Sequence, residues 1–174
     1  MDKKVIVYGS RYGTTERYAR VLAERTGVVA VSYDAAGDLS ACETIIYFGG
    51  LYAGGVLGLA KTVGQLAQAK RLIIVTVGLA DPMDKTNTEH IKASLQKQLP
   101  PELYTRAEFF HLRGGIDYSH LSLKHKAMMK LLYEKVKKLP PEQQTAETRA
   151  MIDTYGQVVD FADLSALDAI MQVL

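Results

Sequence analysis

The sequence predicts one α/β domain, built on a parallel sheet that helices cover on both faces. Short apolar runs alternate with segments of helical periodicity, and this alternation is typical of parallel sheets. The runs are apolar at consecutive positions, as expected of strands that are buried on both faces. A chain of 174 residues has the length of a single domain with a substantial core.

Each element follows from the local pattern of apolar residues. A first strand is expected over 5–8, and a helix whose apolar residues share one face follows over 14–25. Further strands are expected over 28–33, 44–48, 72–77 and 107–112, and further helices over 57–69 and 84–99. Five such strands favour the order 2-1-3-4-5, in which the winding reverses between the first and third strands. Ligands of these sheets bind beyond the carboxyl ends of the strands at that reversal, so a site is expected at the loops 9–15 and 49–56.

The C-terminal part of the single domain 1–174 departs from this alternation. An added helical segment is expected over about 116–174, with helices over 121–139, 145–155 and 165–173. The helix over 121–139 carries an apolar stripe at helical spacing, with lysines around the rest of its surface. The stripe consists of Met128, Leu131, Leu132, Val136 and Leu139.

Composition and charge exclude several classes of protein. The formal net charge is +2, so no large field of one sign points to nucleic acid as a partner. Cys42 is the only cysteine, which excludes an internal disulfide framework and a cysteine-rich metal or iron–sulfur site. His120 and His125 are five positions apart and do not share a helix face, so no metal site is expected. The sequence shows no secretory signal and no apolar run of about 20 residues, so a cytoplasmic protein is expected.

The loop after the first strand has the features of a phosphate-binding site. Its sequence is Gly9-Ser10-Arg11-Tyr12-Gly13-Thr14-Thr15. The N-terminus of the following helix offers unpaired N–H groups and a partial positive charge, which suit a phosphate dianion. Hydroxyl groups add donors, and Gly13 lets the backbone approach closely. The loop is neither a Walker A motif nor Gly-x-Gly-x-x-Gly, and a threonine that simply caps the helix remains an alternative.

Residues 8–15 resemble the FMN-phosphate loop of the flavodoxin family, in which Ser/Thr-x-x-Gly-x-Thr follows the first strand. Ser10, Gly13 and Thr15 fall on the three patterned positions, whereas Tyr12 replaces a hydroxyl residue that is common at its place. The resemblance implies a flavodoxin-like three-layer sandwich and FMN as the cofactor. It also implies that the phosphate lies against Ser10, Arg11, Tyr12, Gly13, Thr14 and Thr15.

Two further loops are expected to border the flavin. The glycine-rich loop after the third strand contributes Gly50, Leu51, Tyr52, Ala53, Gly54 and Gly55. The Tyr52 ring can stack on the isoalloxazine, which is worth about 0.5–1.5 kcal/mol beyond area burial. By resemblance, Gly54 or Gly55 turns a carbonyl toward the flavin N5, and Gly78, Leu79 and Ala80 line the flavin with backbone N–H groups. The alternative to a flavin-binding loop is a tight strand-to-helix turn, in which the glycines only allow the backbone to adopt the required conformation.

The stretch 111–118, followed by a lysine-rich helix, resembles a branch that includes the flavodoxin-like, menaquinone-linked protoporphyrinogen oxidases. Carrier flavodoxins are typically acidic, whereas this chain has an alkaline pI of about 8.5. A basic helix with an apolar stripe can lie on an anionic membrane surface, so peripheral contact through 121–139 is one expectation. The alternative is that the stripe packs on the domain and the lysines are solvated.

Three functions remain open at this point. The first is an FMN oxidoreductase that passes electrons between a small organic substrate and a quinone or other acceptor. In that case the flavin performs the chemistry, and Arg113 and Tyr118 are candidates for holding an anionic substrate. The second is a one-electron carrier with a protein partner, and the third is a non-redox flavodoxin-like binding scaffold.

Overall fold

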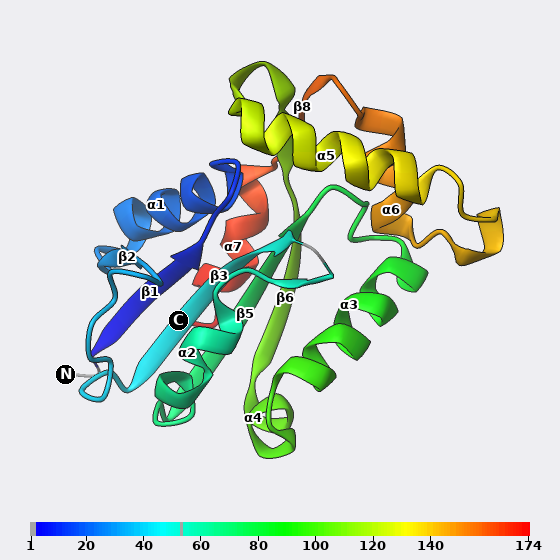
Figure 1. Cartoon of the computed structure of the whole chain (residues 1–174). Helices are drawn as coiled ribbons and strands as arrows, with labels where there is room; N and C mark the ends of the chain where they lie inside the picture. Colours follow the sequence, from blue (N-terminus) through cyan, green and yellow to red (C-terminus); the bar gives the residue numbers. More distant parts are fainter. Residues whose placement is uncertain (1–2, 53) are drawn as a thin grey trace.

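The computed structural model describes residues 3–52 and 54–174, and it shows a parallel sheet between two layers of helices (Figure 1). The long path of the sheet has the order β2-β1-β3-β5-β6, with every neighbouring pair parallel. Its strands are β1 (Lys4–Gly9), β2 (Ala30–Ser32), β3 (Thr44–Tyr52), β5 (Arg71–Gly78) and β6 (Glu108–Arg113). The short β4 (Gly55–Val56) pairs only with β3 and lies off this path. Setting β4 aside, the predicted order 2-1-3-4-5 is confirmed, and the fold is a flavodoxin-like sandwich.

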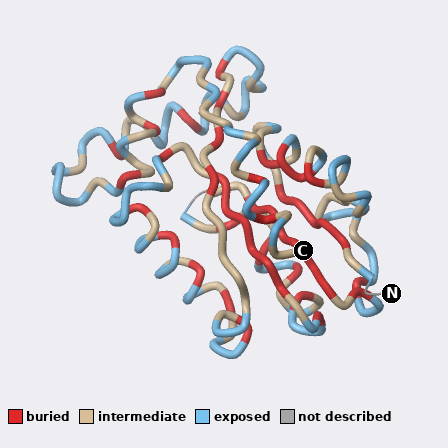
Figure 2. The backbone as a smooth tube through the Cα atoms, turned by 180° about the vertical axis from the view of Figure 1, so that it is seen from behind, coloured by how far each residue is buried: buried red, intermediate tan, exposed pale blue. Residues whose placement is uncertain are grey.

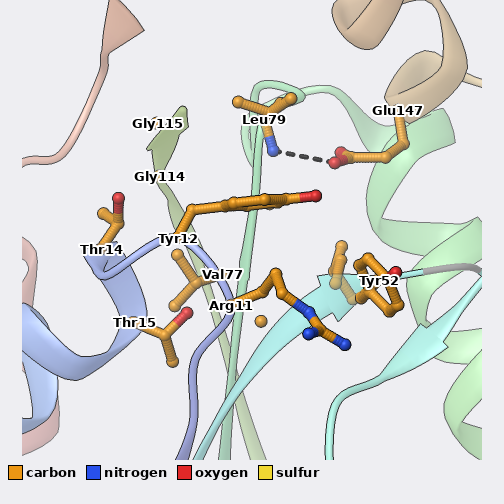
Figure 3. Close-up of a pocket in the computed structure, with 13 residues that line it drawn as sticks. Arg11, Tyr12, Thr14, Thr15, Tyr52, Val77, Leu79, Gly114, Gly115 and Glu147 are labelled. Atoms are coloured by element: carbon orange, nitrogen blue, oxygen red, sulfur yellow. Dashed lines mark hydrogen bonds between the residues drawn. The ribbon is translucent and has the colours of Figure 1, made fainter. Parts of the chain in front are cut away.

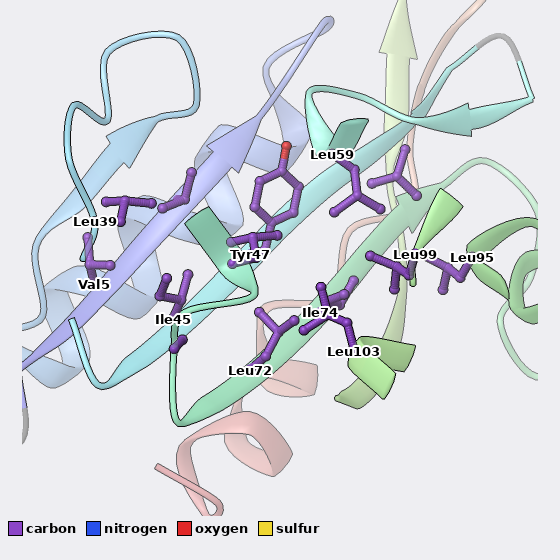
Figure 4. Packing of buried hydrophobic residues seen from close by; sticks show 14 of the residues in the cluster. Val5, Leu39, Ile45, Tyr47, Leu59, Leu72, Ile74, Leu95, Leu99 and Leu103 are labelled. Atoms are coloured by element: carbon purple, nitrogen blue, oxygen red, sulfur yellow. The ribbon is translucent and has the colours of Figure 1, made fainter. Parts of the chain in front are cut away.

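Two apolar clusters hold the helices to the sheet. On one face α1 (Thr14–Thr26) and α7 (Leu167–Met171) cover residues such as Ile6 and Phe48, which are fully buried. On the other face lie α2 (Leu59–Leu66), α3 (Lys85–Gln98) and α4 (Pro101–Arg106), packed on residues such as Tyr47 and Ile74 (Figure 4). Successive strand residues point to opposite faces, so strands that are apolar throughout serve both clusters. In Figure 2 the central strands are accordingly buried along most of their length.

Residues 115–160 leave the sheet and return to it, and we call this segment the excursion. It is closed by an antiparallel pair of strands, β7 (Gly115–Asp117) and β8 (Val158–Asp160). Between them the chain forms η1 (Tyr118–His120), α5 (Leu123–Val136), η2 (Pro141–Gln143) and α6 (Ala146–Thr154). The excursion has an apolar cluster of its own, formed by Ile116, Tyr118, Met129, Val136 and Met151. Figure 1 shows α5 and α6 beyond the carboxyl ends of the sheet strands.

The added segment differs from the predicted one in two respects. Residues 161–174 rejoin the sandwich, because Leu167 and Ile170 of α7 are fully buried in the cluster that contains Tyr18. The predicted stripe on α5 is also only partly buried. The helix packs through the face that carries Met129 and Val136, which leaves Leu131 exposed on the outer side.

Smaller differences concern how elements begin and end. The loop predicted over 49–56 is a continuation of β3 that turns back into β4. The final helical stretch is capped by Asp163, whose carboxylate accepts from the Ser165 N–H group at 2.9 Å, so it begins before the predicted start at 165. Asp84 caps α3 by accepting from the Thr86 N–H group at 2.9 Å, so it has the ordinary role of an N-terminal helix acid.

No helix within the described ranges combines the length and the apolar character needed to cross a bilayer.

Candidate cofactor site

The ends of β3, β5 and β6 and the start of α1 enclose a cavity of about 60 Å³ at the carboxyl edge of the sheet (Figure 3). From the predicted set, the lining residues are Arg11, Tyr12, Thr14, Thr15, Gly50, Leu51, Tyr52, Gly78 and Leu79. Val77, Gly114, Gly115 and Glu147 complete the lining. The structure therefore brings the three predicted loops together at the point where the winding of the sheet reverses.

The first loop presents an uncapped helix end to this cavity. Gly13 is the N-cap of α1 and has a left-handed conformation with φ of 92°, and it makes no side-chain capping bond. The first-turn N–H groups that follow it are not needed by the helix itself, which leaves them available to an anion. Ser10 does not line the cavity, because its hydroxyl accepts from the Gly13 N–H group at 3.1 Å and thereby shapes the loop. A Cβ atom on Gly13 would meet nothing within 4 Å, so the space in front of this turn is open.

The β3–β4 hairpin contributes Gly50, Leu51 and Tyr52. The Arg11 guanidinium lies 4.7 Å from the centre of the Tyr52 ring, a cation–π distance. Gly54 and Gly55 do not line the cavity, and their position beside the flavin stays a prediction. A Cβ on Gly55 would lie 3.2 Å from Gln98 Oε1, so this glycine lets the hairpin pack against α3. Ala53 lies outside the described residues.

The third loop is held by two side chains that come from other elements. Both oxygens of the Glu147 carboxylate accept backbone bonds, from the Leu79 N–H group at 3.0 Å and from the Ala80 N–H group at 2.9 Å. The Arg113 Nε–H group donates to the Leu79 carbonyl at 2.9 Å, and its guanidinium lies 3.9 Å from the centre of the Phe161 ring. Arg113 is thus a structural residue that does not line the cavity, and its prediction as a substrate contact is not supported by this geometry.

Tyr12 and Tyr118 both contact the excursion cluster, but only Tyr12 lines the cavity. In Figure 3 the Tyr12 ring extends into the cavity, between Leu79 on one side and Val77 and Arg11 on the other. Its hydroxyl donates to Met129 Sδ at 3.4 Å, and burial raises the pKa of Tyr12 above its ordinary value. Tyr118 does not line this cavity, because it belongs to the buried cluster of the excursion, where burial raises its pKa to about 12. The expectation that Tyr118 holds a substrate beside the flavin therefore also lacks support from the structure.

Four lining residues were not predicted. Val77, Gly114 and Gly115 lie at or just beyond the ends of β5 and β6. The rule that ligands bind beyond the carboxyl ends of the strands could have indicated them. Glu147 follows no strand, and nothing in its local sequence connects it with the cavity. Among the described residues, no three His, Cys, Asp or Glu side chains gather as a metal site.

Comparison with known proteins identifies the family. A family model described as a flavodoxin domain matches residues 5–143. The chain belongs to the flavodoxin domain family. A search of curated proteins finds no match.

Two solved structures resemble this flavodoxin domain. One is a cysteine-to-alanine mutant of flavodoxin from Pseudomonas aeruginosa, at 20% identity, with 76% of this chain and 95% of that chain covered and a TM-score of 0.41. The other is a protein from Bacteroides eggerthii whose assignment as a flavoprotein is itself provisional. It is 10% identical, with 74% of this chain and 96% of that chain covered and a TM-score of 0.43. At such low scores these likenesses carry no weight beyond the family match.

FMN is the cofactor of this flavodoxin domain, and the donor set of the site fits it. The uncapped start of α1, the hydroxyl groups of Thr14 and Thr15 and the cationic Arg11 suit a phosphate monoester. Tyr52 offers an aromatic face for a flat ring system, and the third loop carries backbone N–H groups that bond to Glu147 in this structure. A cavity of about 60 Å³ is nevertheless far smaller than the roughly 300–1,000 Å³ typical of ligand pockets. The Tyr12 ring extends into this cavity and the Glu147 carboxylate lines it, so these two side chains limit the space that is open to a flavin ring.

Proposed function

We propose that this flavodoxin domain is an FMN-dependent oxidoreductase that passes electrons between a small organic substrate and a quinone or another acceptor. The observation that carries the proposal is the position of the excursion over the cofactor cavity. Arg11 Nη1 lies 3.1 Å from His125 Nε2, Tyr12 bonds to Met129, and the third loop bonds to Glu147. A cover of this kind favours a small substrate over a protein partner, because a carrier must expose its cofactor edge to another protein.

In this proposal the residues of the chain have three roles. The start of α1, with Thr14 and Thr15, would hold the phosphate, and Tyr52 would orient the ring system. The excursion would exclude water from the site, because Tyr12 packs against the apolar cluster that contains Met129. FMN, when bound, supplies the redox chemistry, and the protein supplies position and electrostatics.

The experiment that tests this function begins with the visible spectrum of the purified protein and identification of the released flavin. Stepwise reduction without oxygen follows, and then turnover with candidate substrates and a soluble quinone. The resemblance of residues 111–118 to the menaquinone-linked branch makes protoporphyrinogen the first substrate to assay. Two-electron reduction in one step together with turnover supports the oxidoreductase. Reduction in two separate one-electron steps without turnover supports the carrier, and a protein that takes up no FMN supports a non-redox scaffold.

We also propose that the outer face of α5 contacts an anionic membrane surface. Leu123 and Leu131 are 86% and 73% exposed on this face. Lys124, Lys130 and Lys135 are exposed beside them, and each basic residue near an anionic surface contributes about 1 kcal/mol. Exposed leucines beside lysines fit a partner that is both apolar and negatively charged, as a phosphatidylserine-containing bilayer is.

Sedimentation with phosphatidylcholine vesicles, with and without phosphatidylserine, tests this contact. We expect binding only to the anionic vesicles, and loss of binding in the double variant Leu123→Gln/Leu131→Gln. Val29→Gln removes a side chain that is 65% exposed beside β2, at a distance from α5 along the chain, and serves as the control. Equal sedimentation of the double variant and the control would contradict the contact.

A further inference from the structure

Glu147 of the excursion takes up two backbone hydrogen-bond donors of the third loop, which is predicted to border the flavin. Its two carboxylate oxygens accept from the Leu79 and Ala80 N–H groups at 3.0 and 2.9 Å. Bonds of this kind to an ionised acceptor are roughly twice as strong as those between neutral groups. The carboxylate therefore satisfies both donors fully, and it also lines the cavity.

The strand end is shaped so that this carboxylate can reach it. Gly78 precedes the two donors, and a Cβ atom at that position would lie 3.0 Å from Glu147 Oε2 and 2.7 Å from Leu51 Cδ1. Any larger residue would push against the carboxylate. Glu147 is itself fixed in the first turn of α6, which Thr145 caps by accepting from the Thr148 N–H group. A negative charge in that turn also stabilises the helix.

From these contacts we propose that Glu147 is an internal competitor of the flavin ring for the Leu79 and Ala80 N–H groups. The inference rests on the proposed FMN site, because it concerns donors that would otherwise be available to a ring carbonyl. One donor can serve either the carboxylate or the flavin, so binding of the ring includes the cost of breaking the Glu147 contact. The carboxylate then sets the affinity of the site and reduces it relative to a site whose third loop is free.

The test compares Glu147→Gln with Glu142→Gln in the full chain. Glu142 is an exposed acid of η2 in the same excursion, and both variants remove one negative charge. Dissociation constants for FMN and for riboflavin are measured by quenching of flavin fluorescence. We expect Glu147→Gln to bind both flavins about tenfold more tightly, which corresponds to about 1.4 kcal/mol, and Glu142→Gln to bind like wild type.

Riboflavin separates competition from simple electrostatics. Loss of a negative charge near a phosphate would favour FMN alone, whereas loss of a competitor for the ring favours both ligands equally. Glu147→Asp is the second variant, because it keeps the charge in the first turn of α6 but is one methylene shorter. We expect it to raise the affinity for both flavins in the same direction by a smaller factor, and circular dichroism verifies that each variant is folded.

Amide hydrogen exchange without flavin gives a readout that does not depend on the cofactor. Exchange at Leu79 and Ala80 should accelerate in Glu147→Gln and remain as in wild type in Glu142→Gln. Faster exchange without tighter flavin binding would overturn the competition, and unchanged exchange would overturn the contact itself. Failure of wild type and every variant to bind either flavin would instead contradict the proposed FMN site, and the inference would fall with it.

Discussion

Arg17 and Asp160 form a bidentate salt bridge that connects the excursion to α1, the helix that follows the phosphate loop. Nη1 lies 2.9 Å from Oδ2 and Nη2 lies 2.8 Å from Oδ1. The Arg17 bonds hold the pKa of Asp160 below its ordinary value. Asp160 belongs to β8, where the excursion ends, and Arg17 belongs to the first turns of α1. The pair thus links the closing strands of the excursion to the element that presents the predicted phosphate site.

Arg17→Gln is expected to loosen the excursion with little effect on the whole fold. Both side chains are about half exposed, and exposed ion pairs contribute only about 0–1 kcal/mol, so the free energy of unfolding should fall by no more than that. Amide exchange in β7 and β8 should nevertheless accelerate, because the pair restrains those strands locally. Arg20→Gln breaks a pair with Glu16 within α1 and is the control. Equal exchange in the two variants would contradict the role of Arg17.

Gly13→Ala is expected to weaken FMN binding without weakening riboflavin binding. The left-handed φ of 92° strains any residue with a Cβ atom, and the changed turn would redirect the N–H groups that face the phosphate. Gly27→Ala is a matched control, since Gly27 also has a left-handed φ, 72°, at the other end of α1. The added Cβ atom would meet no other atom within 4 Å at either position. Each substitution should therefore lower the free energy of unfolding by about 1 kcal/mol, through backbone strain alone. A fall in FMN affinity of the same size in both variants would show that strain, rather than the phosphate loop, is responsible.

The sheet could be predicted because its information is local. Each long strand is a run of consecutive apolar residues, and such runs identify buried strands without knowledge of their neighbours. Strands β7 and β8 have three residues each and pair across the whole excursion. Such short strands have no recognisable periodicity of apolar residues, so the sequence does not predict them. Pro100 and Pro101 follow the helix expected over 84–99, yet Pro101 is also the first residue of α4, a position that proline favours.

The residues of the site likewise divide into those that the local sequence predicts and those that only the tertiary structure brings together. The phosphate loop and the third loop follow directly after strands, so the order of strands alone is enough to place them at the carboxyl edge. Glu147 reaches the cavity only because α6 folds back over that edge, a tertiary arrangement that the sequence around Glu147 does not encode. Arg113 and Tyr118 were predicted from their residue types beside the last strand, and packing assigns both of them to structural contacts.

The free energy of unfolding should fall in mild acid because of His111. Burial of the ring, and then the nearby Lys92 ammonium, lower the pKa of His111 to about 4 from an ordinary 6.5. Between these values the unfolded chain binds more protons than the folded one, so stability present above pH 6.5 is lost as the pH falls toward 4. The loss should be about 2 kcal/mol, since the half-buried ring is partly screened by solvent. Urea titrations at about pH 7 and about pH 5 measure it, and a pH dependence that persists in His111→Gln would assign the loss to other groups.

Two buried tyrosines should respond in opposite ways to loss of the hydroxyl group. The Tyr18 hydroxyl donates to the Arg113 carbonyl and accepts from the Asp163 N–H group, both at 2.8 Å. Tyr18→Phe leaves two backbone groups unpaired and should lower the free energy of unfolding by about 2 kcal/mol. The Tyr118 hydroxyl is buried without a partner among the described residues.

Removing the Tyr118 hydroxyl should therefore relieve an unsatisfied group rather than break a bond. We expect Tyr118→Phe to leave the free energy of unfolding unchanged or to raise it by up to about 1 kcal/mol. Urea denaturation of both variants at neutral pH measures the two effects under one condition. The two substitutions remove the same atom from similarly buried rings, so the difference between them reports hydrogen bonding rather than packing. Destabilisation of Tyr118→Phe by as much as Tyr18→Phe would mean that an ordered water pairs with the Tyr118 hydroxyl inside the excursion.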